Sequence, residues 1–277
     1  MPVVQDKERV AHTRAPLEDS TPGPGEEAGA PVSVRAWLLA AFTFFSLSLL
    51  TFHWDHGLSE WIRFHPALNR LFAVSALATT IRAFGKTDVL LCIVFALGAA
   101  GERKTAARIL LALVIAMALI WPLKLGVNRV RPYGDKGESF PSGDAAAVAA
   151  FAVPLVSCST GFLPVVAAAT GAVGLLRVYE SAHYPSDVLA GIGFGLLAGV
   201  LAGAAARHRN LLPARSFFIL LAILLPAGRL LVGSSAKGWL EFLAFLKTAG
   251  PVFLALLAAR FIRFELRKRP APRGWRK

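Results

Sequence analysis

Long apolar runs, separated by short polar and basic stretches, cover most of the chain after residue 33. A helix needs roughly 20 mostly apolar residues to cross a bilayer. The runs that approach this length lie at about residues 36–53, 87–101, 106–126, 143–159, 162–177, 187–206, 216–233 and 239–262. The pattern predicts an all-α protein, a polytopic bundle of transmembrane helices. Six spans form its core, and the last two runs add a C-terminal helix pair.

The second run is short for a span, and the residues before it allow two interpretations. Residues 71–84 either extend this span or form a separate amphipathic helix at the membrane interface. The sixth run has a different feature, a glycine at every fourth position (Gly191, Gly195, Gly199 and Gly203). This spacing predicts a groove along one helix face, into which a neighbouring backbone packs closely.

The chain divides into four predicted segments. Residues 1–33 are polar and rich in proline, glycine and acid. They lack an apolar stretch behind a basic start, which favours a disordered cytosolic arm over a signal peptide. Residues 34–210 hold the six-span core, 211–266 the C-terminal helix pair, and 267–277 a basic cytosolic tail.

Composition supports a membrane protein and excludes several other classes. Hydrophobic residues make up 55% of the chain and charged residues 17%, whereas soluble domains are about one quarter charged. Two cysteines cannot build a secreted disulfide scaffold. The net charge of +13 could suit nucleic acid. However, the basic residues stand at the ends of apolar runs, as membrane topology requires, so we expect no nucleic-acid partner.

The basic residues also predict an orientation. Those before the odd-numbered spans and in the C-terminal tail fall on one side, which the positive-inside rule assigns to the cytoplasm. The opposite side nevertheless receives Lys124, Arg129, Arg131, Lys136 and Arg177. Because these residues break the topological rule, a chemical role explains them better than an anchoring role.

Three segments on this outer side hold most of its reactive side chains. They are residues 124–132, 139–144 and 177–187. The first and third supply cations that bind phosphate oxygens well, and the second opens a helix whose N-terminal N–H groups favour an anion. His183 and Asp187 are four residues apart, a spacing that allows contact if the segment is helical, although Pro185 complicates a regular turn. Together these groups indicate phosphoryl transfer through a phosphohistidine. The alternative for any single residue is structural, since Lys and Arg at membrane edges often extend to headgroups.

The three segments resemble the type 2 phosphatidic acid phosphatase family, the membrane lipid phosphatases related to vanadium haloperoxidases. The family pattern is K-x6-R-P, then P-S-G-H, then S-R-x5-H-x3-D. The matching residues here are Lys124, Arg131, Pro132, Pro141, Ser142, Gly143, Arg177, His183 and Asp187. The resemblance covers about residues 36–206.

The resemblance implies a role for each matching residue. His183 would be the nucleophile and Asp187 its orienting partner. Lys124, Arg131 and Arg177 would hold the phosphate oxygens, and Ser142 and the Gly143 N–H would complete the clamp. The family needs no metal or other cofactor, and we expect none here.

Two positions depart from the family pattern. Asp144 replaces the histidine that protonates the leaving group, and Leu176 replaces the serine before Arg177. We expect Asp144 to be ionised among the cations and to become a proton donor once a bound phosphate offsets them. Leu176 only removes a hydroxyl near the site.

A further cluster, His53-Trp54-Asp55-His56, follows the first span on the same outer side. A metal site needs more ligands than this cluster guarantees. Trp54 and Trp61 favour an aromatic belt at the membrane interface instead.

The sequence therefore predicts an integral-membrane lipid phosphatase, with its site on the extracytoplasmic face of a bacterial inner membrane. Its partner would be a lipid phosphate in the bilayer, either a monoester or a diphosphate. A lipid-to-lipid phosphotransferase is an alternative, because only the acceptor differs. A non-catalytic lipid-phosphate binder is another, although binding alone would need neither His183 nor Asp187. No feature of the sequence indicates an oligomeric state.

Overall fold

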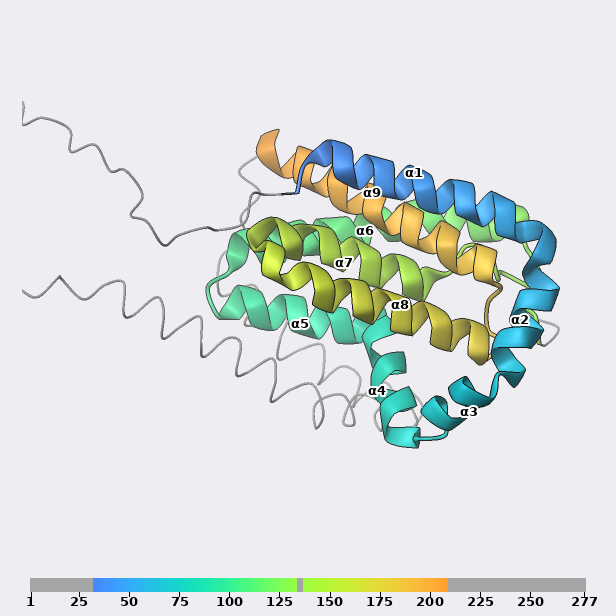
Figure 1. Cartoon of the computed structure of the whole chain (residues 1–277). Helices are drawn as coiled ribbons and strands as arrows, with labels where there is room; N and C mark the ends of the chain where they lie inside the picture. The colour runs from blue at the N-terminus through green and yellow to red at the C-terminus, as the bar shows by residue number, and fades with distance from the viewer. Residues whose placement is uncertain (1–31, 134–136, 209–277) are drawn as a thin grey trace, which may run out of the picture.

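The structure, a computed structural model, describes residues 32–133 and 137–208, and every regular element in this part is helical (Figure 1). The elements are α1 (Val34–Thr51), η1 (Phe52–Trp54), α2 (Asp55–Phe64), α3 (Pro66–Phe72), α4 (Ser75–Gly85), α5 (Thr87–Ala99), α6 (Arg103–Val127), α7 (Gly143–Cys158), η2 (Thr160–Phe162), α8 (Leu163–Tyr179) and α9 (Pro185–His208). The all-α fold is confirmed. Apart from residues 32 and 33, the predicted N-terminal arm lies outside the described residues, as do the C-terminal helix pair and the basic tail.

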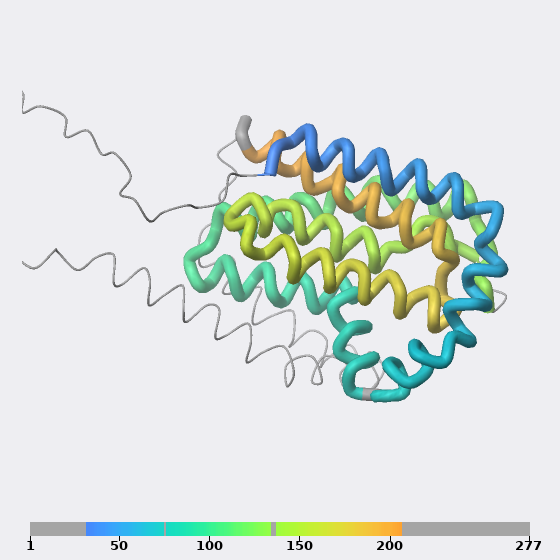
Figure 2. The backbone as a smooth tube through the Cα atoms, viewed as in Figure 1, coloured from blue at the N-terminus to red at the C-terminus, as the bar shows by residue number. Residues whose placement is uncertain are grey.

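Six helices, α1 and α5 to α9, run side by side along one direction and form the bundle (Figures 1 and 2). Helix α9 packs against α1, α6 and α7, and α7 also packs against α6 and α8. Helix α7 lies at the centre, where most of its residues are buried. Its many alanines allow the surrounding helices to approach closely.

Four of the predicted spans are long and apolar enough to cross a membrane. They are Val34–Phe64, Arg103–Val127, Thr160–Tyr179 and Pro185–Ala206. The remaining two, α5 and α7, have 13 and 16 residues, or roughly 20 and 24 Å of helix. Both are shorter than the hydrocarbon core of about 30 Å. The chain is an integral membrane protein, and the count of six spans stays a prediction.

Helices α2, α3 and α4 connect α1 to α5 across one end of the bundle (Figure 1). Residues 71–84 do not extend α5, because Lys86 has an extended backbone that separates α4 from α5. The first of the two interpretations is therefore wrong, and a separate helix forms. Trp61 of α2 and Trp54, which directly precedes α2, are each 61% exposed, as residues of an interfacial belt would be.

The glycine groove of α9 is confirmed at three of its four positions. A Cβ on Gly195 would lie 2.3 Å from the Ala146 carbonyl oxygen, and one on Gly191 would lie 2.4 Å from the Ser142 carbonyl oxygen. On Gly199 it would lie 2.5 Å from the Val153 Cβ. At Gly203 nothing comes within 4 Å, so the close approach of α7 to α9 ends before this residue.

Gly195→Ala should destabilise the bundle, because the new methyl group meets backbone atoms of α7 that cannot move independently. Overpacking of this kind typically lowers the free energy of unfolding by about 1–3 kcal/mol. Gly203→Ala is the matched control and should be neutral or stabilising by up to about 1 kcal/mol. Thermal unfolding in detergent measures both variants, and equal midpoints would contradict the close packing described for Gly195.

Candidate active site

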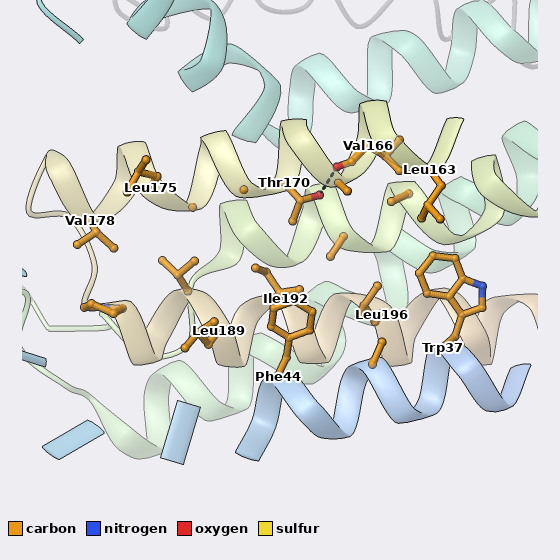
Figure 3. Close-up of a pocket in the computed structure, with 18 residues that line it drawn as sticks. Trp37, Phe44, Leu163, Val166, Thr170, Leu175, Val178, Leu189, Ile192 and Leu196 are labelled. Atoms are coloured by element: carbon orange, nitrogen blue, oxygen red, sulfur yellow. Dashed lines mark hydrogen bonds between the residues drawn. The ribbon is translucent and has the colours of Figure 1, made fainter. Parts of the chain in front are cut away.

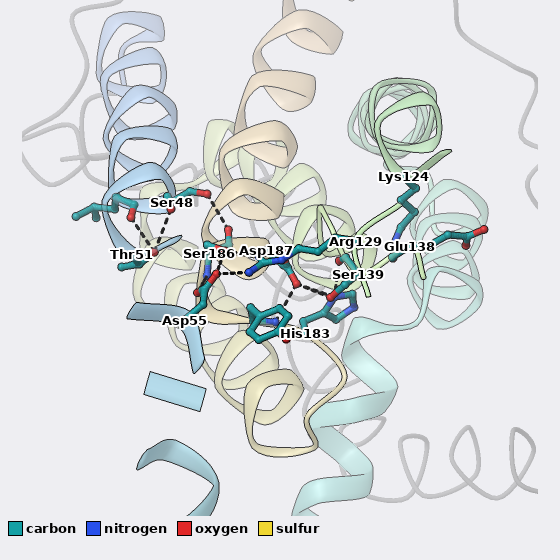
Figure 4. Close-up of polar contacts among 12 residues, drawn as sticks. Ser48, Thr51, Asp55, Lys124, Arg129, Glu138, Ser139, His183, Ser186 and Asp187 are labelled. Carbon is teal, nitrogen blue, oxygen red and sulfur yellow. Dashed lines mark hydrogen bonds and ion pairs between the residues drawn. The ribbon is translucent and has the colours of Figure 1, made fainter. Parts of the chain in front are cut away.

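The three motif segments meet at the end of the bundle that α2, α3 and α4 cross (Figure 4). Helices α6 and α8 end there, and α7 and α9 begin there, because successive helices alternate in direction. Asn128 ends α6 in a left-handed conformation with φ of 43°, and its N–H bonds to the Lys124 carbonyl at 3.0 Å. This C-cap redirects the chain into the loop that leads to α7.

His183 is buried between this loop and the start of α9, with 5% of its surface exposed. Its Nδ1 lies 2.7 Å from the Ser139 carbonyl oxygen. A carbonyl only accepts hydrogen bonds, so Nδ1 carries the proton and the lone pair of the neutral ring is on Nε2. Among the described residues, none forms a hydrogen bond with Nε2. The ring is therefore oriented and has an unbonded, basic nitrogen.

Asp187 is fully buried, and its nearest carboxylate oxygen lies 3.9 Å from His183 Nδ1. This distance is too long for a hydrogen bond. The carboxylate instead accepts hydrogen bonds from the Ser139 hydroxyl and, at 2.9 Å, from the Tyr184 N–H. Because α9 starts only at Pro185, the four-residue spacing does not lie on a regular turn. Ser139 thus links the two residues, with its carbonyl on the imidazole and its hydroxyl on the carboxylate.

The hydrogen bond from the Tyr184 N–H to the Asp187 carboxylate also stabilises the start of α9. Asp187 is the third residue of the helix, and its side chain bonds back to the N–H that precedes it, as in a capping box. A negative charge in the first turn also interacts favourably with the helix dipole. The local fold therefore holds Asp187 independently of any substrate.

Two of the predicted phosphate-binding cations, Lys124 and Arg177, lie beside the start of α7. Lys124 donates to the Glu138 carbonyl at 2.6 Å, and its Cε lies 3.9 Å from the position of a Cβ on Gly143. Arg177 pairs with Asp144 and, at 2.9 Å, with Glu180. The Nε atoms of Arg131 and Arg177 are buried and have no hydrogen-bond acceptor among the described residues. Such donors need an acceptor to offset their desolvation.

Ser142 is the N-cap of α7, and its hydroxyl accepts a hydrogen bond from the Ala145 N–H at 3.5 Å. Its own N–H donates to the Asp187 carbonyl at 2.9 Å, which fixes α7 against α9. The Gly143 and Asp144 N–H groups open the helix, and no described residue accepts from them. This is the arrangement that binds anions at helix N-termini.

The two residues that depart from the family pattern have different surroundings. The Asp144 side chain is 26% exposed and faces Arg177 at the edge of the site. Gly85 of α4 packs against it, since a Cβ there would lie 3.2 Å from Asp144 Cβ. Leu176 is buried in an apolar cluster with Phe72 and Ala78, where a serine hydroxyl would be poorly accommodated.

Sequence reasoning did not assign Arg129 and Asp55 to the site. One nitrogen of the Arg129 guanidinium bonds to Asp187 at 2.7 Å, and the other bonds to Asp55 at 2.8 Å (Figure 4). The guanidinium also lies over the rings of Phe52 and Tyr184, at 4.3 and 4.0 Å. The sequence signals were the misplaced positive charge of Arg129 and an acid beside Trp54. Nothing in the spacing indicated that the two residues pair.

Burial raises the pKa of Tyr184, and the nearby carboxylates of Asp187 and Asp55 add to this effect while Arg129 opposes it. The phenol therefore stays neutral around pH 7. The Arg129 guanidinium therefore stacks on the face of an uncharged aromatic ring, in a cation–π contact.

A cavity of about 450 Å³ lies between α1, α7, α8 and α9, beside the site (Figure 3). Its lining is almost entirely apolar and includes Trp37, Phe44, Thr170, Leu189 and Ile192. Val178 and Pro185 line it close to the segment that carries His183. Gly171 also lines it, and a Cβ there would have no atom within 4 Å.

Comparisons with known proteins identify relatives of this chain. The model of the PAP2 superfamily matches residues 105–210. A lipid A 1-phosphatase of Rhizobium etli is 31% identical over 198 residues, which cover 60% of this chain and 82% of that protein. A lipid A 1-phosphatase of Rhizobium johnstonii is 35% identical over 88 residues, 26% of this chain and 36% of that protein.

A solved structure shares the fold. It is a transmembrane PAP2-type phosphatidylglycerolphosphate phosphatase from Bacillus subtilis, 24% identical, with a TM-score of 0.50 over 63% of this chain and 98% of that one. The motifs, the fold and the long match to the Rhizobium etli protein lead to one conclusion: the chain belongs to the PAP2 superfamily, the membrane phosphatases of the type 2 phosphatidic acid phosphatase kind.

Proposed function

We propose that the chain removes phosphate from a lipid phosphate monoester or diphosphate by way of a phosphohistidine at His183. The observation that carries this proposal is the state of the imidazole. The ring is buried, its Nδ1 proton is bound by the Ser139 carbonyl at 2.7 Å, and its Nε2 has no described partner. An oriented nitrogen nucleophile beside several cations is suited to attack phosphorus.

The reaction has two steps. First, Nε2 of His183 attacks phosphorus, the bond to the leaving oxygen breaks, and that oxygen takes a proton from Asp144. Second, water attacks the phosphorus of the phosphohistidine, the P–N bond breaks, and the proton of the water returns to the Asp144 carboxylate. The imidazole is regenerated and inorganic phosphate leaves. Proton transfer by a positioned side chain typically contributes about 10²–10⁴-fold to the rate.

The residues around the start of α7 would hold the phosphate oxygens. Lys124, Arg131 and Arg177 supply positive charge, and the first N–H groups of α7 supply donors. The two buried Nε atoms that have no acceptor among the described residues support this role, since phosphate oxygens accept several such bonds at once. Donors that are already fixed stabilise the charge of the transition state without reorganisation.

The Asp144 role depends on Arg177. In the described structure the carboxylate pairs with this guanidinium. A bound phosphate would compete for the same guanidinium and repel Asp144, which favours its protonated form. Asp144 could then donate the proton that the histidine donates in the family pattern.

The substrate class follows from the membrane and from the apolar cavity. The lining residues Val178 and Pro185 lie at its end nearest the site, so an acyl chain in the cavity would place its headgroup near His183. The names of the Rhizobium relatives make the 1-phosphate of lipid A a candidate, and the Bacillus structure adds phosphatidylglycerolphosphate. Phosphatidate and an isoprenyl diphosphate complete the set.

The site would face the extracytoplasmic side of a bacterial inner membrane. The basic residues in the first turns of α1 and α6, at the other end of the bundle, support this orientation under the positive-inside rule, whereas Arg63, Arg70 and Arg82 of α2 to α4 lie at the same end as the site. A lipid-to-lipid phosphotransferase is the second candidate, since the phosphohistidine could also pass phosphate to a lipid hydroxyl. Adding a lipid acceptor to the assay separates the two.

The purified protein in detergent should release inorganic phosphate from at least one of the four lipid phosphates, and His183→Gln should abolish this release. Glutamine cannot form the covalent intermediate, although it retains a polar side chain. His56→Gln is the matched control, an exposed histidine at the same end whose ring packs on Tyr184. A His183→Gln protein that folds and keeps wild-type turnover would refute the mechanism.

The side of the membrane that the site faces is tested with a short-chain, membrane-impermeant analogue of the lipid phosphate that the protein hydrolyses. Right-side-out vesicles should hydrolyse this analogue, and inverted vesicles should do so only after detergent is added. The opposite result would place the site on the cytoplasmic face.

Asp144→Asn should lower turnover by about 10²-fold on a monoester with a poor alkoxide leaving group, since asparagine cannot donate the proton. Turnover on a diphosphate or an activated aryl ester should fall much less, because these leaving groups need little protonation. Equal losses on both substrates would instead assign Asp144 to the positioning of Arg177. Undiminished monoester turnover would remove it from the mechanism.

Gly171→Leu should reduce turnover of long-chain lipid phosphates and leave a water-soluble aryl phosphate unaffected, because the new side chain projects into the apolar cavity. Gly126→Leu is the matched control, an exposed glycine with no atom within 4 Å of a Cβ and outside the cavity lining. The ratio of kcat/KM for the two substrates measures the effect. An unchanged ratio would mean that acyl chains bind elsewhere.

A further inference from the structure

Two buried carboxylates meet at the start of α9, and one cation joins them (Figure 4). Asp55 is 1% exposed and Asp187 0%, and the Arg129 side chain is 15% exposed. Placing two carboxylates in a buried site is costly unless each charge is paired and hydrogen-bonded. The Arg129 fork supplies both pairings, at 2.8 Å to Asp55 and 2.7 Å to Asp187.

Asp55 also holds the first turn of α9 directly. One of its carboxylate oxygens accepts from the Ser186 N–H at 2.9 Å, and the other accepts from the Ser186 hydroxyl. The Ser186 hydroxyl oxygen in turn accepts from Arg129 at 2.8 Å, and the Ser186 carbonyl accepts from the Ser48 hydroxyl at 2.9 Å. An acid from the α2 segment thus caps α9, a helix far away in the sequence.

A series of hydrogen bonds connects the Arg129–Asp187 ion pair to the imidazole of His183. Arg129 bonds to one oxygen of Asp187, and the Ser139 hydroxyl bonds to the other oxygen. The Ser139 carbonyl accepts from His183 Nδ1. Each link is a hydrogen bond between buried or largely buried groups, so a shift at Arg129 changes the position of the imidazole.

We propose that Asp55 and Arg129 are positioning residues that hold Asp187 and Ser139 in the arrangement that aims Nε2 of His183 at phosphorus. The inference rests on the proposed function, because it concerns the nucleophile of that reaction. Neither residue contacts the phosphate in this account. The aromatic rings of Phe52 and Tyr184 on both sides of the guanidinium add to its fixed position.

Positioning predicts a specific kinetic pattern. Misplacing a reacting group by about 1 Å can cost about 10²-fold in rate, while ground-state binding of phosphate uses Lys124, Arg131 and Arg177. A variant that loses stabilisation of the transition state should bind a transition-state analogue more weakly by about the same factor as its rate falls, while its affinity for a ground-state ligand is unchanged. Vanadate, which adopts the five-coordinate geometry of phosphoryl transfer, is the first probe, and inorganic phosphate is the second.

The experiment uses the full-length protein with Arg129→Lys, Arg129→Ala and Asp55→Asn. In each variant kcat and vanadate affinity should both fall by about 10²-fold, while the inhibition constant of phosphate stays within about threefold. Lysine has one ammonium group and cannot bridge both carboxylates. Added guanidinium ion should restore part of the kcat of Arg129→Ala, which a general folding defect would not permit.

Arg63→Gln is the matched control. Arg63 also lies over an aromatic ring, that of Tyr133 at 4.0 Å, and donates to a serine hydroxyl, that of Ser181 at 3.3 Å. No carboxylate of the described residues pairs with it. The kcat of the Arg63→Gln protein should stay within about twofold of wild type, as for most substitutions outside a buried network.

Two outcomes would overturn the inference. A folded Arg129 variant with kcat within about twofold of wild type overturns it. Equal losses of phosphate and vanadate affinity overturn it too, because the residue would then serve phosphate binding. If both Arg129 variants fail to fold, Asp55→Asn decides by the same criteria. A wild-type protein without turnover on any lipid phosphate would instead refute the proposed function.

Discussion

The start of α9 is the constraint on which the site depends. Asp55, Arg129 and Asp187 form one buried ion pair network there, and it joins three segments that are far apart in the sequence. An unpaired carboxylate at this depth would be strongly unfavourable, so the three segments must meet before the network is stable. The imidazole of His183 is then placed by the Ser139 carbonyl, whose own side chain is part of the same network.

The close packing of α7 and α9 complements this polar network. Gly191 lets the Ser142 carbonyl approach α9, and the Ser142 N–H bonds to the Asp187 carbonyl at 2.9 Å. The helix N-terminus proposed to bind phosphate is therefore fixed to the helix that carries Asp187. Small residues drive helix association in a membrane, because the lipid leaves little hydrophobic driving force between helices. The same packing thus supports both the fold and the geometry of the site.

The sequence predicted the six helices of the bundle well, because hydropathy and helix length are linked directly by the thickness of the bilayer, but it did not predict α2 and α3, which are short and amphipathic or polar. It also predicted that residues 124–132, 139–144 and 177–187 meet at one end, because charges on the wrong side of a span need an explanation. The link through Ser139 was not predictable, since it depends on a loop that brings one carbonyl onto the ring. Asp55 was missed for a similar reason. A lone acid beside Trp54 resembles an interfacial residue until its partner, Arg129, is placed over it.

In the proposed mechanism, the Ser139 carbonyl fixes the tautomer of His183 and leaves Nε2 as the nucleophile. The most direct measurement traps the phosphorylated protein during turnover with an alkaline quench, which preserves the P–N bond, and determines which ring nitrogen carries phosphorus. Phosphorus NMR of the isolated peptide distinguishes the two isomers. Phosphate is expected on Nε2 of His183. Phosphate on Nδ1, on another residue, or on no residue during turnover would contradict this mechanism.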